Sequence, residues 1–209
     1  HDYGDFLTDI VTYEGSSDFG TALIFFVAFL CIAFLRTGDL PSIVMITAAA
    51  GFAGGIVLRF KPYVLARFAV WRHAWEYAQE EGYQQTRTMS AVASGGLFGA
   101  GPEEAWLKYV GAANTDLVFG VVSEEFGLLL ALCAAAAVIL LGIYALRAAG
   151  RSRSSFYAIA ACATAAMLVF QTTLNVLGSV DLLPLTGVTF PFVSMGGSSM
   201  LSCWGLLAY

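Results

Sequence analysis

The chain has 209 residues, of which 58% are apolar and only 12% are charged, and its formal net charge is −5. A soluble domain of this size carries roughly 25% charged residues, so the composition argues against a soluble helical bundle and favours a membrane protein. The negative balance, without a basic stripe carrying interleaved aromatic residues, argues against a nucleic-acid-binding surface.

Charged residues are spaced along the chain at intervals that match the thickness of a bilayer, since a helix needs about 20 apolar residues to cross the hydrocarbon. We expect five spanning helices and one incomplete one, at 19–35, 41–58, 83–100, 117–146, 155–178 and 196–209. The third is rich in Gly, Ala and Ser and carries Arg87, so it is expected to pack inside the bundle, shielded from lipid. The sequence therefore predicts an all-α, polytopic membrane bundle that forms a single domain over residues 1–209.

The basic residues predict the orientation of these helices, because cytoplasmic loops carry an excess of Lys and Arg. With alternating crossings, seven of the ten basic residues fall in two loops on one side: Arg59, Lys61, Arg67, Arg72, Arg147, Arg151 and Arg153. That side is predicted to be cytoplasmic. The loops at about 101–116 and 179–195 are then both extracytoplasmic.

The first of these outer loops ends in Asp116, at the point where a polar stretch becomes an apolar helix. One interpretation is a helix N-cap, since Asn, Thr and Asp accept backbone N–H bonds there. The other is a general base at the membrane surface, where partial desolvation raises the pKa of a carboxyl group toward the working pH. The two are compatible, because a cap would also fix the direction of the carboxylate. For Glu124, about two turns later, we favour a structural role over the lining of a cavity.

The second outer loop contains Pro184, Gly187 and Pro191, which prevent a regular helix. A non-helical apolar stretch at membrane depth must be buried in protein or line a cavity. We expect residues 185–195 to be irregular and to line a cavity mouth facing Asp116. Gly196-Gly197-Ser198-Ser199 then opens the last helix, either as an anion site for a lipid pyrophosphate or as a Gly hinge with a Ser N-cap.

Four segments, in order along the chain, resemble motifs of the FtsW/RodA/SpoVE (SEDS) family. They are SDFGTALIFF (17–26), GYQQTRTMSAVASGGLFGAG (82–101), NTDLVFGVVSEEFG (114–127) and LLPLTGVTFPFVSMGGSSM (182–200). The resemblance reaches across most of the chain. It implies the C-terminal half of a ten-helix family fold, lacking roughly the first four helices and the end of the last.

The resemblance also implies a function, that of a peptidoglycan glycosyltransferase. Such an enzyme polymerises lipid II into glycan strands at the outer face of the bacterial cytoplasmic membrane, for cell shape, division or sporulation. Its usual partner is a class B penicillin-binding protein transpeptidase. The alternatives are a lipid II flippase and a non-catalytic scaffold that recruits the transpeptidase. The chain alone is expected to be inactive.

Residue by residue, the resemblance places the family's functional aspartate on Asp116, which as general base would deprotonate the acceptor hydroxyl. The predicted substrate-binding residues are Thr115, Lys108, Pro191, Ser194, Gly196, Gly197, Ser198 and Ser199. The undecaprenyl pyrophosphate leaving group needs charge neutralisation, by a divalent ion or by cationic and N–H donors. No protein metal site is predicted, because the four cysteines lack CxxC spacing and the two histidines are isolated. Asn114 departs from the family pattern, which commonly has His at this position.

Overall fold

The computed structural model describes residues 18–60 and 62–208, and in this part of the chain it contains helices and no strand, which confirms the predicted all-α class. The elements are α2 (Asp18–Thr37), α3 (Leu40–Phe60), α4 (Pro62–Val70), α5 (Tyr83–Gly95), the short 3₁₀ helix η1 (Leu107–Tyr109), α6 (Val118–Phe126), α7 (Leu128–Ala149), α8 (Ser155–Ser179) and α9 (Gly197–Ala208).

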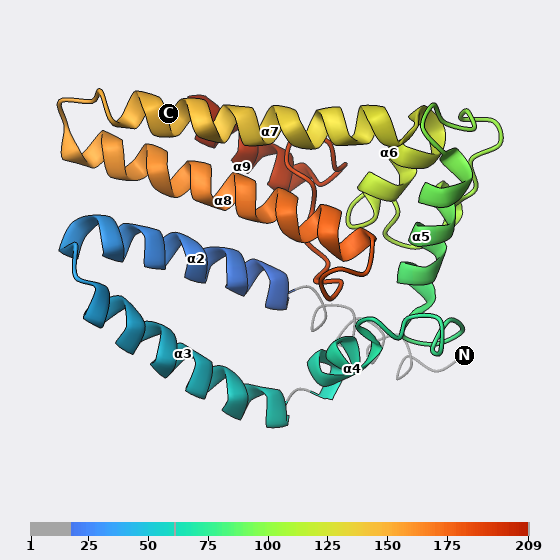
Figure 1. Cartoon of the computed structure of the whole chain (residues 1–209), viewed down its shortest axis with the longest axis horizontal. Coiled ribbons are helices and arrows are strands. Elements are labelled where there is room, and N and C mark those ends of the chain that lie inside the picture. The colour runs from blue at the N-terminus through green and yellow to red at the C-terminus, as the bar shows by residue number, and fades with distance from the viewer. Residues whose placement is uncertain (1–17, 61, 209) are drawn as a thin grey trace, which may run out of the picture.

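Three of these helices, α2, α7 and α8, are long and apolar enough to cross a membrane, and α3 contains a shorter apolar stretch, Leu40–Gly55. Helix α8 packs between α2 and α7, and the three run side by side (Figure 1). Small residues permit the α7–α8 contact, since a Cβ atom on Gly142 would lie only 2.6 Å from a methyl group of Val169. The charge spacing located these helices because each apolar run has bilayer length.

The predicted spanning helix at 117–146 is in fact two helices, α6 and α7, separated at Gly127. Gly127 has a φ of +96°, and a Cβ atom there would lie 2.3 Å from the carbonyl oxygen of Leu97. The backbone groups freed by this break bond to the neighbouring segment, since the Leu128 N–H donates to the Gly96 carbonyl at 2.9 Å. The single-helix prediction was therefore wrong, because backbone contacts between distant segments impose the break.

The predicted third spanning helix, 83–100, is also corrected. Helix α5 has 13 residues and ends at Gly95, so it is about 20 Å long, which is too short to cross the hydrocarbon. It packs against α6 and buries polar side chains, including Gln85 and Thr88. The predicted position inside the bundle holds only for this face of α5, since the helix lies at the end of the molecule (Figure 1) and Tyr83 is exposed. Arg87 is exposed, with its guanidinium over the rings of Tyr83 at 5.1 Å and Trp106 at 5.8 Å.

Because α5 does not cross, the orientation inferred from the basic residues is partly wrong. Nη1 of Arg67 donates to the carbonyl of Leu185 at 2.9 Å, and the Arg72 backbone N–H donates to the Asp181 carboxylate at 3.0 Å. The basic stretch around α4 therefore lies at the same end as the 179–195 loop, not opposite it. The α7–α8 turn and the α2–α3 turn lie together at the other end (Figure 1).

The two loops predicted to share one side of the membrane do share one end of the bundle. The Met195 N–H, in the second loop, donates to the carbonyl of Asn114 in the first at 2.8 Å. This pairing of segments some eighty residues apart builds the region around Asp116.

Candidate active site

Asp116 lies in a tight turn just before α6, at the end of the helix bundle. The backbone N–H groups of Asp116 and Leu117 both donate to the carbonyl of Ala112, at 2.9 and 3.3 Å, and Ala112 itself has a φ of +62°. The N-cap of α6 is Leu117, and no side chain caps this helix. The N-cap interpretation of Asp116 is therefore wrong, and its carboxylate is available for other contacts.

The surroundings of Asp116 favour a carboxyl group that holds its proton more tightly than usual. The side chain is half-buried, and this burial raises the pKa of Asp116 above its ordinary value, while a hydrogen bond from the Thr115 side chain and the positive charge of Arg67 lower it. Desolvation is the largest of these effects. A carboxyl group with a raised pKa is better matched to accept a proton near neutral pH.

Arg67 and Gly187 form the wall that faces the Asp116 carboxylate. A Cβ atom on Gly187 would lie 3.3 Å from Oδ2 of Asp116 and 3.6 Å from Nη1 of Arg67. Sequence reasoning missed Arg67, because it assigned that residue to a cytoplasmic loop. An available signal was Pro62 followed by an apolar run, which is typical of a helix that starts with proline at its first position.

The segment 185–195 is irregular, as predicted, and most of its apolar side chains are buried or partly buried, with Met195 exposed. Phe190 is only 1% exposed and packs in a cluster with Val118 and Ala135. Helix α2 approaches the segment closely, since a Cβ atom on Gly20 would lie 2.4 Å from a methyl group of Val188. Burial between helices therefore shields much of this backbone at membrane depth, while Gly187 faces Asp116 as predicted.

The structure brings two of the predicted substrate-binding residues to the turn of Asp116 and directs Lys108 elsewhere. Thr115 precedes Asp116 in the same turn, and Ser194 contacts Thr115 through a hydrogen bond from its hydroxyl to the Thr115 carbonyl. Lys108, by contrast, lies in η1, where its ammonium group donates to the Pro102 carbonyl and lies over the ring of Tyr109. These contacts direct Lys108 toward its own loop rather than toward Asp116.

The remaining predicted residues flank the start of α9 or are buried. Pro191 is buried, Gly197 and Ser198 are exposed, and Gly196 is partly buried. The hydroxyl of Ser199 is hydrogen-bonded to the hydroxyl of Thr189 at 2.8 Å. Gly197 and Ser198, exposed at the start of α9, are thus the part of this motif open to an anion.

Glu124 has the structural role that the sequence favoured. The side chain is 1% exposed. It accepts backbone N–H bonds from Trp106 at 3.2 Å and from Leu107 at 3.0 Å. The carboxylate thereby ties α6 to η1 across the loop that leads to Asp116.

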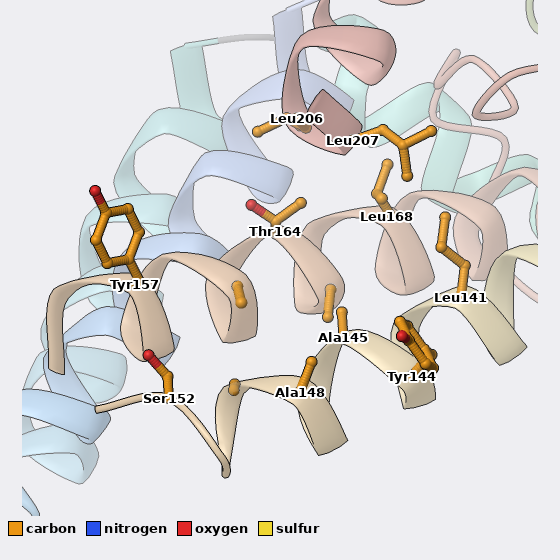
Figure 2. Close-up of a pocket in the computed structure, with 14 residues that line it drawn as sticks. Leu141, Tyr144, Ala145, Ala148, Ser152, Tyr157, Thr164, Leu168, Leu206 and Leu207 are labelled. Carbon is orange, nitrogen blue, oxygen red and sulfur yellow. The ribbon is translucent and has the colours of Figure 1, made fainter. Parts of the chain in front are cut away.

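A separate apolar cavity of about 400 Å³ lies between α7, α8 and α9 (Figure 2). Its lining includes Leu141, Thr164, Leu168 and Leu207, and it is situated near the α7–α8 turn, at the end of the bundle opposite Asp116. The residues that line it include no carboxylate, imidazole or basic side chain.

Fold and site together define a polytopic helical membrane protein with a half-buried carboxylate at one end of its bundle. The comparisons with known proteins then identify the family. The family model FTSW_RODA_SPOVE, described as "Cell cycle protein", matches residues 8–208, and the chain belongs to this family.

Relatives of known name agree with this assignment. The chain is 34% identical over 194 residues to the peptidoglycan glycosyltransferase RodA of Mycobacterium leprae, covering 91% of this chain and 41% of that protein. It is 31% identical over 212 residues to the probable peptidoglycan glycosyltransferase FtsW of Bacillus subtilis, covering 91% of this chain and 51% of the relative. The chain thus spans about half the length of these proteins.

A solved structure shares the fold. It comes from work on "structural coordination of polymerization and crosslinking by a peptidoglycan synthase complex", and it superposes with a TM-score of 0.68 at 23% identity. The match covers 90% of this chain and 53% of that one. At this identity the likeness supports the fold.

Proposed function

We propose that the full-length protein containing this chain is a peptidoglycan glycosyltransferase that polymerises lipid II at the outer face of the bacterial cytoplasmic membrane. The observation that carries the proposal is the half-buried Asp116, whose pKa is raised by burial and whose carboxylate faces Gly187 and Arg67. The names of the relatives support the reaction class.

The assigned role of Asp116 is that of general base. Its carboxylate accepts the proton of the acceptor sugar's hydroxyl as that oxygen attacks the anomeric carbon of the donor. The bond from that carbon to the pyrophosphate oxygen breaks, and undecaprenyl pyrophosphate leaves with the electron pair. Such a base contributes roughly 10²- to 10⁴-fold in rate.

The leaving pyrophosphate needs its charge neutralised, and we assign this to cationic and N–H donors. Candidates are Arg67, beside the carboxylate, and the exposed backbone at Gly197 and Ser198. The alternative is a divalent ion held by the substrate phosphates together with one or two carboxylates, for which Asp116 is the candidate. Among the described residues, no group of three or more His, Cys, Asp or Glu side chains forms a site made of protein ligands alone.

The proposed orientation places Asp116 outside. The opposite end of the bundle carries the α7–α8 turn with Arg147, Arg151 and Arg153, together with Arg36 at the end of α2. Arg67, Arg72, Arg87 and Lys108 lie toward the Asp116 end, so the number of basic residues does not select the cytoplasmic side. The outer placement rests instead on the resemblance of the loop around Asp116 to the outer loop of the family. A donor and an acceptor outside the membrane would then meet the Asp116 end.

We also propose that the protein works with a class B penicillin-binding protein transpeptidase, which would crosslink the new strands. The solved structure with the same fold concerns a complex in which polymerization and crosslinking are coordinated. That description supports a comparable partnership here.

The test is to incorporate the purified full-length protein into liposomes that contain lipid II. A glycosyltransferase forms glycan strands in these liposomes although no other polymerising enzyme is present. A flippase moves lipid II between leaflets without making polymer, and a scaffold does neither. The proposal fails if a folded protein, with or without its transpeptidase, forms no strands.

A further inference from the structure

Three consecutive backbone carbonyls at Asp116 are held by donors from much later in the chain. The carbonyl of Asn114 accepts from the Met195 N–H at 2.8 Å, that of Thr115 from the Ser194 hydroxyl at 2.5 Å, and that of Asp116 from Nδ2 of Asn175 at 2.9 Å. Two of these donors are side chains, one from α8 and one from the irregular segment. Residues 114–116 lie outside any helix, so these bonds fix a backbone that has little regular structure of its own.

Both donor side chains are buried, and each makes a second hydrogen bond to the irregular segment 185–195. Ser194 is 2% exposed, and its hydroxyl also accepts from the Phe190 N–H at 2.7 Å. Asn175 is 2% exposed, and its Nδ2 also donates to the Val188 carbonyl at 2.7 Å. Each residue therefore links the turn that carries Asp116 to the segment that contains Gly187.

Asn175 has a further feature that argues for a role beyond folding. Its Oδ1 is buried and has no hydrogen-bond partner among the residues that the structure describes. An unsatisfied buried acceptor destabilises a fold. The two carbonyl acceptors require the NH₂ group to face them, so the amide cannot turn over to relieve Oδ1.

We propose that Asn175 and Ser194 are positioning residues that hold the backbone of Thr115 and Asp116, so that the Asp116 carboxylate faces Gly187. This inference rests on the proposed function and deepens it. It gives Ser194, which the family motif suggested as a substrate contact, a role through Asp116 instead. A displacement of about 1 Å in a reacting group can lower turnover about 10²-fold, so two hydrogen bonds to this backbone can control the rate.

The test uses Asn175→Leu and Ser194→Ala in the full-length protein, with lipid II as substrate and Thr172→Val as the matched control. Thr172 is a buried residue of α8 whose hydroxyl donates only to the Leu168 carbonyl within its own helix. We expect Asn175→Leu to lower kcat at least about 10-fold and Ser194→Ala at least about 3-fold, with KM within about 3-fold of the parent. The control should keep the parent kcat. If Asn175→Leu does not fold, Ser194→Ala alone tests the inference. This substitution removes a single oxygen atom, so the variant is expected to fold.

A second readout separates positioning from a general structural role. Each substitution is combined with Asp116→Asn, and residual turnover is measured in single-turnover reactions. If a residue acts through Asp116, its substitution causes no further loss of turnover when Asp116 is already Asn. The inference is overturned if the folded single variants keep kcat within about 2-fold, or if their losses multiply with that of Asp116→Asn. Full turnover by Asp116→Asn itself would instead overturn the proposed function.

Discussion

Gly187 lies directly against the carboxyl group of Asp116, so that a methyl group on its Cα would come within 3.3 Å of Oδ2. The same methyl group would lie 3.6 Å from Nη1 of Arg67. Gly187 also has a φ of +71°, a backbone conformation that residues other than glycine rarely adopt. Glycine is therefore favoured at position 187 for two reasons: the backbone conformation, and the lack of room for a side chain beside the Asp116 carboxylate.

Gly187→Ala is therefore expected to lower lipid II polymerisation by the full-length protein about 10-fold or more, because the new methyl group displaces the carboxylate or the guanidinium. The matched control is Gly111→Ala, in the loop before Asp116, where a Cβ atom meets nothing within 4 Å and φ is not positive. Equal turnover by the two folded variants would show that the contact at Gly187 is unimportant for the reaction.

The raised pKa of Asp116 sets a pH dependence. Burial raises this pKa, so turnover that needs the ionised carboxylate is lost as pH falls through a value higher than that of an ordinary aspartate. The charge of Arg67 lowers the same pKa. Arg67→Gln should therefore move the acid limb of the kcat profile to higher pH and reduce turnover at neutral pH.

Arg72→Gln is the control for Arg67, since it removes the same charge from the same end of the molecule without a contribution to the pKa of Asp116. A pH profile of Arg67→Gln that matches that of Arg72→Gln would exclude the assigned electrostatic role.

Glu124→Gln should lower the stability of the protein, with little effect on turnover per folded molecule. The buried carboxylate accepts two backbone N–H bonds, and a neutral amide accepts them more weakly while burying an NH₂ group that needs partners. The expected loss is about 1–3 kcal/mol of unfolding free energy, measured as a lower Tm, with turnover per folded molecule nearly unchanged. Glu125→Gln, at the next and partly exposed position, should keep the parent Tm. If Glu124→Gln abolishes turnover at unchanged Tm, the residue belongs to the chemistry.

The sequence predicted the long helices and the location of the site well, for physical reasons. Apolar runs of bilayer length bounded by charges have few alternatives to a spanning helix, which is why α2, α3 and α8 were located within two residues at each end. Prolines and glycines forbade a helix over 185–195, and the motif around Asp116 marked the turn that the structure places at the end of the bundle.

The sequence failed where contacts between distant segments decide the structure. The break at Gly127 depends on the carbonyl of Leu97 lying against it, and no local pattern reveals that contact. The orientation of the α4 region failed because α5 was counted as a crossing, although it is too short and buries Gln85 and Thr88. That error assigned Arg67 to the wrong side and concealed its place beside Asp116.

The most direct test of the central claim is the turnover of Asp116→Asn in the full-length protein, with purified lipid II and matched amounts of folded enzyme. Asn keeps the side-chain volume, and Asp116 caps no helix. Because burial raises the pKa of Asp116, its ionisation opposes folding as pH rises through that pKa, so the variant should keep or raise the Tm at neutral pH. Turnover is expected to fall about 10²- to 10⁴-fold, since Asn cannot accept the proton. Polymerisation within a few-fold of the parent rate would contradict the assignment of Asp116 as the general base.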